Sequence, residues 1–172
     1  MTDNLPFITR DTSHTISLLV ANKPGVLLRI SLIFSRRGFN IESLVVSPTL
    51  DGRFSRMTIT AQGNPATLEQ IIKQASKLVD VVHATEHRDQ TAVQKELALI
   101  KVKITPENTS EVLQVVQHFK ALTVDLTAHS VIIQATGSTE KLDAMMGFLA
   151  TYGIIELVRT GKIVMARGKE KT

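Results

Sequence analysis

The chain has 172 residues, of which 43% are hydrophobic and 21% are charged, and its 20 basic and 16 acidic residues give a formal net charge of +4. This composition is that of an ordinary globular protein and excludes wholesale disorder. The chain contains no cysteine, which excludes disulfides, thiolate metal sites and cysteine nucleophiles.

Neither a membrane nor a nucleic acid is an expected partner. No apolar run reaches the roughly 18 residues of a membrane helix, and the first residues lack a secretion signal. The basic residues are scattered, with Arg36-Arg37 as the nearest thing to a cluster, and aromatic residues for base stacking make up only 4%. We therefore expect a cytoplasmic protein.

The first half of the chain predicts the order β-α-β-β-α-β. Runs of β-branched and apolar residues predict the strands, and apolar side chains recurring every three or four residues predict the helices. The predicted strands are residues 14–20, 41–47, 54–61 and 79–85, and the helical faces are Val26, Ile30, Ile33 and Phe34 and then Leu68, Ile71, Ile72 and Ala75. The Asp51-Gly52 pair predicts a hairpin turn.

The same order recurs after a polar stretch, residues 86–94, which we interpret as a linker. Strands are predicted at 97–104, 122–128, 131–136, 154–158 and 163–166, and helical faces at Val112, Val115, Val116 and Phe119 and at Leu142, Met145, Met146 and Leu149. The sequence thus predicts an α+β protein of two ferredoxin-like βαββαβ units, with antiparallel sheets and helices on one face. The predicted domains are residues 13–87 and 95–168.

Apolar residues stand side by side in some predicted strands, as in Leu18-Leu19-Val20. Neighbouring residues of a strand point to opposite faces of a sheet, so apolar surface remains after helices cover one face. We expect the chain to form a dimer or a larger assembly.

The sequence shows no catalytic or metal-binding pattern. The five histidines have no HExxH or other ligand spacing, and no GxGxxG or P-loop glycine pattern occurs. His83 and His87 are four residues apart, but they fall where a strand meets the linker rather than on a helix. We interpret all five histidines as structural and assign no catalytic residue.

The turn Ala21–Val26, between the first strand and the first helix, is a candidate ligand site. The Asn22 amide can both donate and accept, and Gly25 has no side chain to keep a ligand off the backbone. Free N–H groups at the start of a helix favour a carboxylate, and the Asn22 oxygen can accept from an ammonium group. The alternative is that Asn22 merely caps the helix.

Several stretches resemble one protein family. They are NKPGVLLRISLIFSRRGFNIESLVVSPT at 22–49, FSRMTIT at 54–60, LEQIIKQASKLVDVV at 68–82, ELALIKVKI at 96–104 and RTG-x-I-V-M-A-R-G at 159–168. Together they resemble the acetolactate (acetohydroxyacid) synthase small subunit, whose first unit is an ACT domain. The resemblance covers nearly the whole chain beyond the first dozen residues.

That resemblance implies an amino-acid site shared by two subunits. In the family two ACT domains pair side by side and a feedback amino acid, usually valine, binds at their junction. The implied ligand residues are Asn22, Gly25 and Val26 of one subunit with Asn40 and Ile41 of the other, the branched side chains of Val26 and Ile41 contacting the ligand. Many relatives carry alanine at the position of Val26, which leaves the choice among valine, leucine and isoleucine open.

The resemblance also implies a role without catalysis. The partner would be the large catalytic subunit, which binds thiamine diphosphate, Mg2+ and FAD, so we expect none of these cofactors in this chain. Amino-acid binding would shift the complex toward a less active state. The second unit has Thr105-Pro106-Glu107 in place of the first turn, so we assign it to dimerisation and contact with the catalytic subunit.

Two other functions stay open at this point. One is a free-standing ACT module that regulates another enzyme or transcription, although such modules are usually fused to a catalytic or helix-turn-helix segment. The other is a small enzyme on a ferredoxin-like scaffold, which would need a phosphate cradle beside an arginine; Arg36 and Arg37 lie at a helix end instead.

Overall fold

The computed structural model describes residues 13–87, 91–170 and 172. The chain divides into two compact units. The first comprises the described residues up to Ala92 together with Val164–Thr172, and the second is Val93–Ile163. Among the described residues, none of the helices combines the length and the apolar composition that a membrane span requires.

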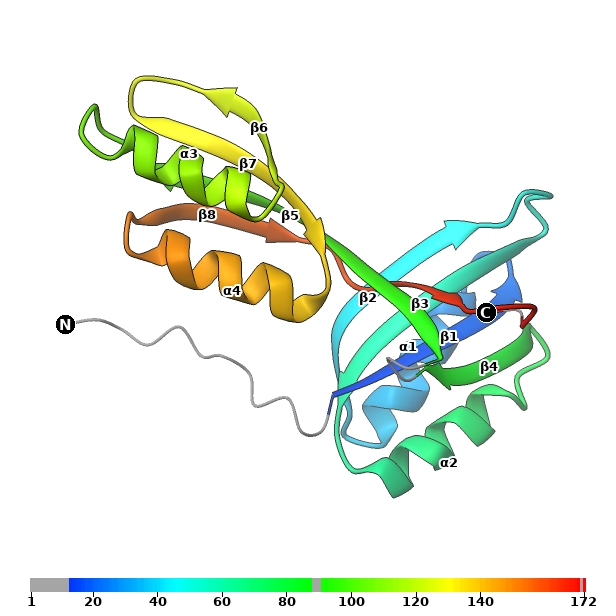
Figure 1. Cartoon of the computed structure of the whole chain (residues 1–172). Helices are drawn as coiled ribbons and strands as arrows, with labels where there is room; N and C mark the ends of the chain where they lie inside the picture. Colours follow the sequence, from blue (N-terminus) through cyan, green and yellow to red (C-terminus); the bar gives the residue numbers. More distant parts are fainter. Residues whose placement is uncertain (1–12, 88–90, 171) are drawn as a thin grey trace. The chain divides into compact units, whose positions relative to one another are not determined.

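The first unit is a four-stranded antiparallel sheet with two helices on one face (Figure 1). Its elements are β1 (Ser13–Ala21), α1 (Val26–Arg36), β2 (Asn40–Pro48), β3 (Phe54–Gln62), α2 (Pro65–Ala75) and β4 (Val81–His87). The strand order is β2-β3-β1-β4, which leaves β2 and β4 at the edges. This arrangement confirms the predicted ferredoxin-like order.

The core of this unit lies between the sheet and the helices. Alternate residues of β1, Ile16 and Leu18, meet Ile30 and Phe34 of α1, and each is at most 1% exposed. Burying a side chain of this size stabilises the fold by about 1.5–3 kcal/mol. α2 starts where Asn64 Oδ1 accepts from the Ala66 N–H at 2.8 Å, a side-chain cap ahead of Pro65.

The other face of the same sheet is polar and also buried. Thr15, Ser17, Thr58, Thr60 and His87 are all less than 9% exposed. Neighbouring residues of a strand point to opposite faces, so these side chains point away from the helices that cover the apolar core. The sheet therefore has buried side chains on both faces, apolar ones toward the helices and polar ones on the opposite face.

The second unit repeats this architecture. Its elements are β5 (Ala92–Lys103), α3 (Thr109–His118), β6 (Leu122–Leu126), β7 (Ser130–Gly137), α4 (Thr139–Ala150) and β8 (Ile154–Arg159). The short strand β9 (Ile163–Ala166), most of which belongs to the first unit, pairs with β5. The strand order β6-β7-β5-β8 matches that of the first sheet. The predicted face of α4 is confirmed, because Leu142, Met145 and Leu149 are fully buried.

The ends of α1 and α3 show how closely the units correspond. Phe39 N–H donates to Phe34 O at 3.0 Å after α1, and Ala121 N–H donates to Val116 O at 2.9 Å after α3. The residue before each donor has a positive φ, 69° at Gly38 and 52° at Lys120. Lys120 thus adopts a left-handed conformation that glycine adopts more easily. The same hydrogen bond closes both helices, and it is formed with a residue in this conformation.

Two sequence predictions differ from the structure. β4 begins at Val81 rather than at residue 79, since Val79 is 98% exposed in the preceding turn. The predicted linker at 86–94 is wrong at both described ends: β4 continues through His87 and β5 already begins at Ala92. Pairing with β1 accommodates the polar residues of β4, and residues 88–90 lie outside the described part of the chain.

Candidate functional site

The β1–α1 turn is tied to the β2–β3 hairpin. The Asn22 Nδ2 donates to Gly52 O at 3.0 Å, and its backbone N–H donates to Arg53 O at 2.9 Å. α1 itself begins after Gly25 with no side-chain cap. The alternative in which Asn22 caps α1 is therefore wrong, because its side chain fastens the turn to the neighbouring hairpin.

This arrangement leaves one acceptor and several donors at an exposed turn. Asn22 Oδ1 accepts no hydrogen bond from any residue in the described part of the chain. The first N–H groups of α1, beginning with that of Val26, have no partner within the helix. One acceptor beside several donors is chemically complementary to an ammonium group and a carboxylate.

The backbone conformation of the turn favours glycine at position 25. The Gly25 φ of 84° is a left-handed conformation that strains residues with side chains. A Cβ atom there would also lie 3.2 Å from Arg29 Nη1. Arg29 is in turn held by Asp80, with 2.5 Å between Nη2 and Oδ2. The turn is thus fixed on one side by Asn22 and bordered on another by Arg29.

Val26 occupies a different place from the one its predicted role implies. Its side chain is 1% exposed and belongs to the core. Within one chain, the Val26 side chain is therefore not accessible for the contact with a ligand that was expected of it. Val26 can contribute its backbone N–H at the start of α1 instead.

Asn40 and Ile41 lie at the opposite end of the sheet from Asn22. Asn40 pairs with Gln62, whereas Pro48, at the far end of β2, is close to the turn. The eight residue steps between Asn40 and Pro48 span about 26 Å of strand. The structure therefore does not bring Asn22 and Asn40 together within one chain; they could meet only across two chains.

Two of these contacts could not be predicted from sequence patterns. Arg29 and Asp80 are distant in the chain, and neither follows a motif, so their ion pair emerges only from the fold. The bond from Asn22 to Gly52 likewise joins two turns that are 30 residues apart. The glycine after Asp51 was the one sequence signal near that contact, and it indicated a hairpin rather than a site.

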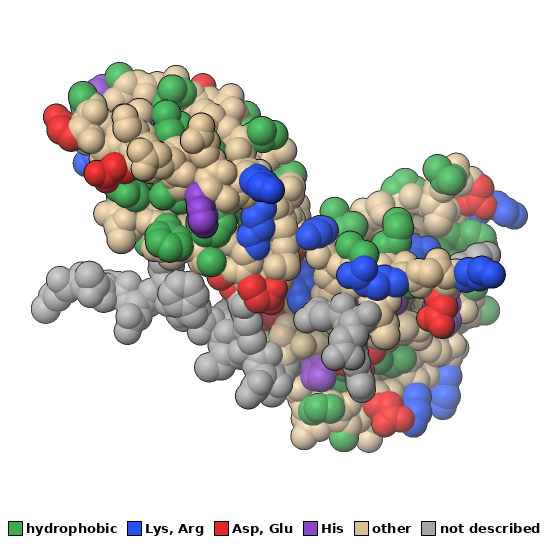
Figure 2. Space-filling view, viewed as in Figure 1, with side chains coloured by type: hydrophobic (Ala, Val, Ile, Leu, Met, Phe, Trp, Pro, Cys, Tyr) green, Lys and Arg blue, Asp and Glu red, His purple; other side chains and the backbone are tan. Residues whose placement is uncertain are grey.

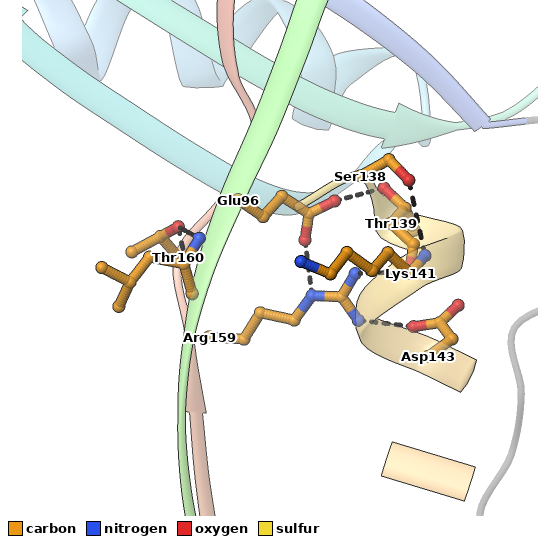
Figure 3. Close-up of polar contacts among 8 residues, drawn as sticks. Glu96, Ser138, Thr139, Lys141, Asp143, Arg159 and Thr160 are labelled. Atoms are coloured by element: carbon orange, nitrogen blue, oxygen red, sulfur yellow. Dashed lines mark hydrogen bonds and ion pairs between the residues drawn. The ribbon is translucent and has the colours of Figure 1, made fainter. Parts of the chain in front are cut away.

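A second polar cluster lies inside the second unit (Figure 3). Arg159 of β8 donates from Nε to Glu96 Oε2 at 2.5 Å and from Nη1 to Asp143 Oδ1 at 2.7 Å. Glu96 is only 7% exposed and also accepts from the Thr139 hydroxyl. These groups face one another, so the cluster joins β5, α4 and β8 as an internal ion-pair network.

The histidines do not form a metal site in the described residues, where no group of three or more His, Asp or Glu side chains converges. His87 is buried in β4, not in a linker, and its Nε2 lies 2.6 Å from Ser17 Oγ. Burial lowers the pKa of His87, and the electrostatic effects of Arg56 and His83 lower it further. His87 is thus held neutral as part of the fold.

Comparison with known proteins agrees with this architecture. Residues 16–83 match a family model described as an AHAS small subunit-like ACT domain, and residues 95–168 match the model of the small subunit of acetolactate synthase. The chain is 45% identical to the probable acetolactate synthase small subunit of Archaeoglobus fulgidus, over 92% of this chain and 99% of that one.

Two further relatives extend the match. The acetolactate synthase small subunit of Mycolicibacterium smegmatis is 44% identical over 91% of this chain and 92% of its own length. The crystal structure of the small subunit from Thermotoga maritima superposes with a TM-score of 0.81 and 38% identity, covering 92% of this chain and 99% of that one. The chain therefore belongs to the acetolactate synthase small-subunit family and carries that family's ACT domain in its first unit.

Proposed function

We propose that this chain is the regulatory subunit of an acetolactate synthase in branched-chain amino-acid biosynthesis. It binds a large catalytic subunit in the cytoplasm, raises its activity, and lowers that activity again when valine or a related amino acid binds. Family membership supports the partner and favours this role over a free-standing ACT module. The observation that carries the sensing role is the exposed Asn22 acceptor beside the free N–H groups of α1.

The proposed site is completed by a second copy of the chain. β2 is an edge strand with unpaired backbone groups, and α1 contacts it while α2 contacts β4. α1 carries exposed leucines, with Leu28 63% and Leu32 42% exposed. Apolar side chains also reach the surface of both units (Figure 2). Antiparallel pairing of two β2 edges would cover the backbone groups and bring the two α1 helices together.

Such pairing would explain the distance between Asn22 and Asn40. In an antiparallel pair the start of one β2 strand lies beside the end of the other. Asn40 and Ile41 of one copy would then approach the Asn22 turn of the second copy. The Asn22 oxygen would accept from the ligand ammonium group, the α1 N–H groups would hold its carboxylate, and Ile41 would contact its branched side chain.

We further propose that this subunit binds none of the cofactors of the enzyme. Thiamine diphosphate, Mg2+ and FAD would reside in the catalytic subunit, where pyruvate is condensed. The role of this chain would be to bias the catalytic subunit between a more active and a less active arrangement. The second unit would contribute to dimerisation and to contact with the catalytic subunit.

Reconstitution with a purified catalytic subunit tests the proposal. The chain should raise acetolactate formation, and valine should lower it. Asn22→Ala should still stimulate activity but should lose inhibition by valine, whereas the neighbouring variant Lys23→Ala should keep both effects. Absence of stimulation and of any response to valine, leucine or isoleucine would refute the assignment.

A further inference from the structure

We propose that Arg29 is a ligand-binding residue of the amino-acid site, where its guanidinium binds the ligand carboxylate. The residue lies one helical turn into α1, and its side chain reaches back over the start of the helix, so that Nη1 lies beside Gly25. The inference rests on the proposed sensing role and adds to it a residue that binds the negatively charged group of the ligand.

Asp80 holds Arg29 through Nη2, and Nη1 has no hydrogen-bond partner among the described residues, so it is available to a ligand. The ion pair uses Nη2, while Nη1 faces the turn. The Asp80 side chain is only 14% exposed, and its backbone oxygen accepts from the Ala21 N–H at 2.8 Å. Asp80 is therefore anchored at the end of β1. The Arg29 side chain remains 46% exposed, so a carboxylate at the turn can reach it.

The second unit provides an internal comparison. There Lys103 N–H donates to Gly153 O at 2.9 Å, the counterpart of the bond from Ala21 to Asp80. The matching ends of α1 and α3 fix the correspondence along the first helix of each unit. Counting back from those ends places Glu111 at the position of Arg29.

Glu111 gives the second unit the opposite charge at this place. Burial raises the pKa of Tyr152, which is next to Gly153, and its interaction with the Glu111 carboxylate raises that pKa further. In each unit, a side chain of the first helix interacts with a residue of the turn before the fourth strand. Only the first unit presents a cation there, whereas a carboxylate ligand near Glu111 would meet a like charge. The contrast explains why one repeat suits an amino acid and the other does not.

The competing explanation is that Arg29 and Asp80 merely tie two parts of the fold together. The two explanations differ in what happens when each partner is changed. If Arg29 only completes a tie, removing either charge disturbs the turn equally. If Arg29 binds the ligand, Asp80→Asn keeps the binding cation and Arg29→Gln removes it.

Calorimetric titration of the full chain with L-valine separates them. Arg29→Gln should weaken binding about tenfold or more, as expected for a lost charge-assisted hydrogen bond, and Asp80→Asn less than about threefold. Arg36→Gln, an exposed change in the last turn of the same helix, should leave affinity unchanged. Circular dichroism and the melting temperature should show that every variant is folded.

Each outcome decides between the claims. Unchanged binding by Arg29→Gln, or equal losses in Arg29→Gln and Asp80→Asn, would overturn the role of Arg29 while the unmodified chain still binds valine. If the unmodified chain binds none of the branched-chain amino acids, the proposed sensing function fails and the role of Arg29 fails with it.

Discussion

The imidazole of His87 lies 2.6 Å from the hydroxyl of Ser17, measured from Nε2 to Oγ, and both residues are less than 9% exposed. They join the edge strand β4 to β1 on the sheet face opposite the helices. Protonating this ring would place a charge in a buried position near Arg56, which explains the direction of its pKa shift.

The stability of the first unit should therefore fall in mild acid. The pKa of His87 is lowered in the folded chain, so the unfolded chain binds the proton first as the pH drops. Stability should be constant well above the unfolded pKa of about 6.5, decrease as the pH falls through it, and level off below the folded pKa. Melting temperatures measured from about pH 8 to about pH 5 test this window.

His87→Asn should flatten that pH profile, because it removes the titrating ring. His118→Gln, a change at an exposed position in the last turn of α3, should leave the slope as it is. A His87→Asn profile as steep as that of the unmodified chain would assign the acid sensitivity to other groups.

Removing Arg159 should strongly destabilise the second unit. The guanidinium compensates two carboxylates, those of Glu96 and Asp143, and Glu96 is almost fully buried. Arg159→Met should lower the free energy of unfolding by roughly 3–5 kcal/mol, the usual loss when one partner of a buried ion pair is removed. Urea denaturation measures this change.

The exposed pair of Lys73 and Glu69 on α2 is the matched control. Both side chains are 68% exposed, and such pairs contribute little in water. Lys73→Met should change the free energy of unfolding by less than about 0.5 kcal/mol. Equal effects of the Arg159 and Lys73 variants would show that the internal network contributes no more than a surface pair.

Gly25→Ala and Gly38→Ala should separate backbone strain from ligand binding. Both glycines have a positive φ, 84° and 69°, so alanine should destabilise either position by about 1–2 kcal/mol. Only Gly25 borders the proposed site and Arg29. Gly25→Ala should abolish valine inhibition of the reconstituted enzyme, whereas Gly38→Ala should retain it, and loss in both would point to a general effect of strain.

Charged substitutions on α1 should disrupt self-association. Leu28→Asp combined with Leu32→Asp places two carboxylates on the proposed contact between copies and should weaken the dimer at least about tenfold. Light scattering after size exclusion should shift from twice 18.9 kDa toward 18.9 kDa. Val79→Asp, at a fully exposed turn, should not alter the measured mass. If the double variant of α1 remained a dimer, the contact between copies would lie elsewhere.

Hydrophobic periodicity was sufficient to predict the fold. The faces built on Ile30 and Phe34 and on Leu142 and Met145 are buried as expected, because a helix that covers a sheet must turn one apolar stripe inward. The linker prediction failed because polarity alone does not distinguish a loop from a paired strand. The strands at this point are held by backbone hydrogen bonds and tolerate side chains such as Glu86.

The candidate site was only partly predictable for a physical reason. Asn22 and Gly25 stand together in one turn, so their residue types reveal it directly. Arg29 and Asp80 meet because α1 and the α2–β4 turn are folded side by side, and the partner of Asn22 is a backbone oxygen at Gly52. Because every residue has a backbone oxygen, the residue type does not show which of them accepts the hydrogen bond. Local patterns therefore locate the turn, but not the side chains that support it.

The separation of Asn22 and Asn40 along the sheet has a consequence for cells that make little of this protein. If each half of the pocket belongs to a different copy, the response to the amino acid depends on protein concentration as well as on ligand concentration. Dilution would then dissociate the dimer and remove the amino-acid site while each chain stayed folded. At low protein concentration the proposed feedback inhibition would therefore be lost.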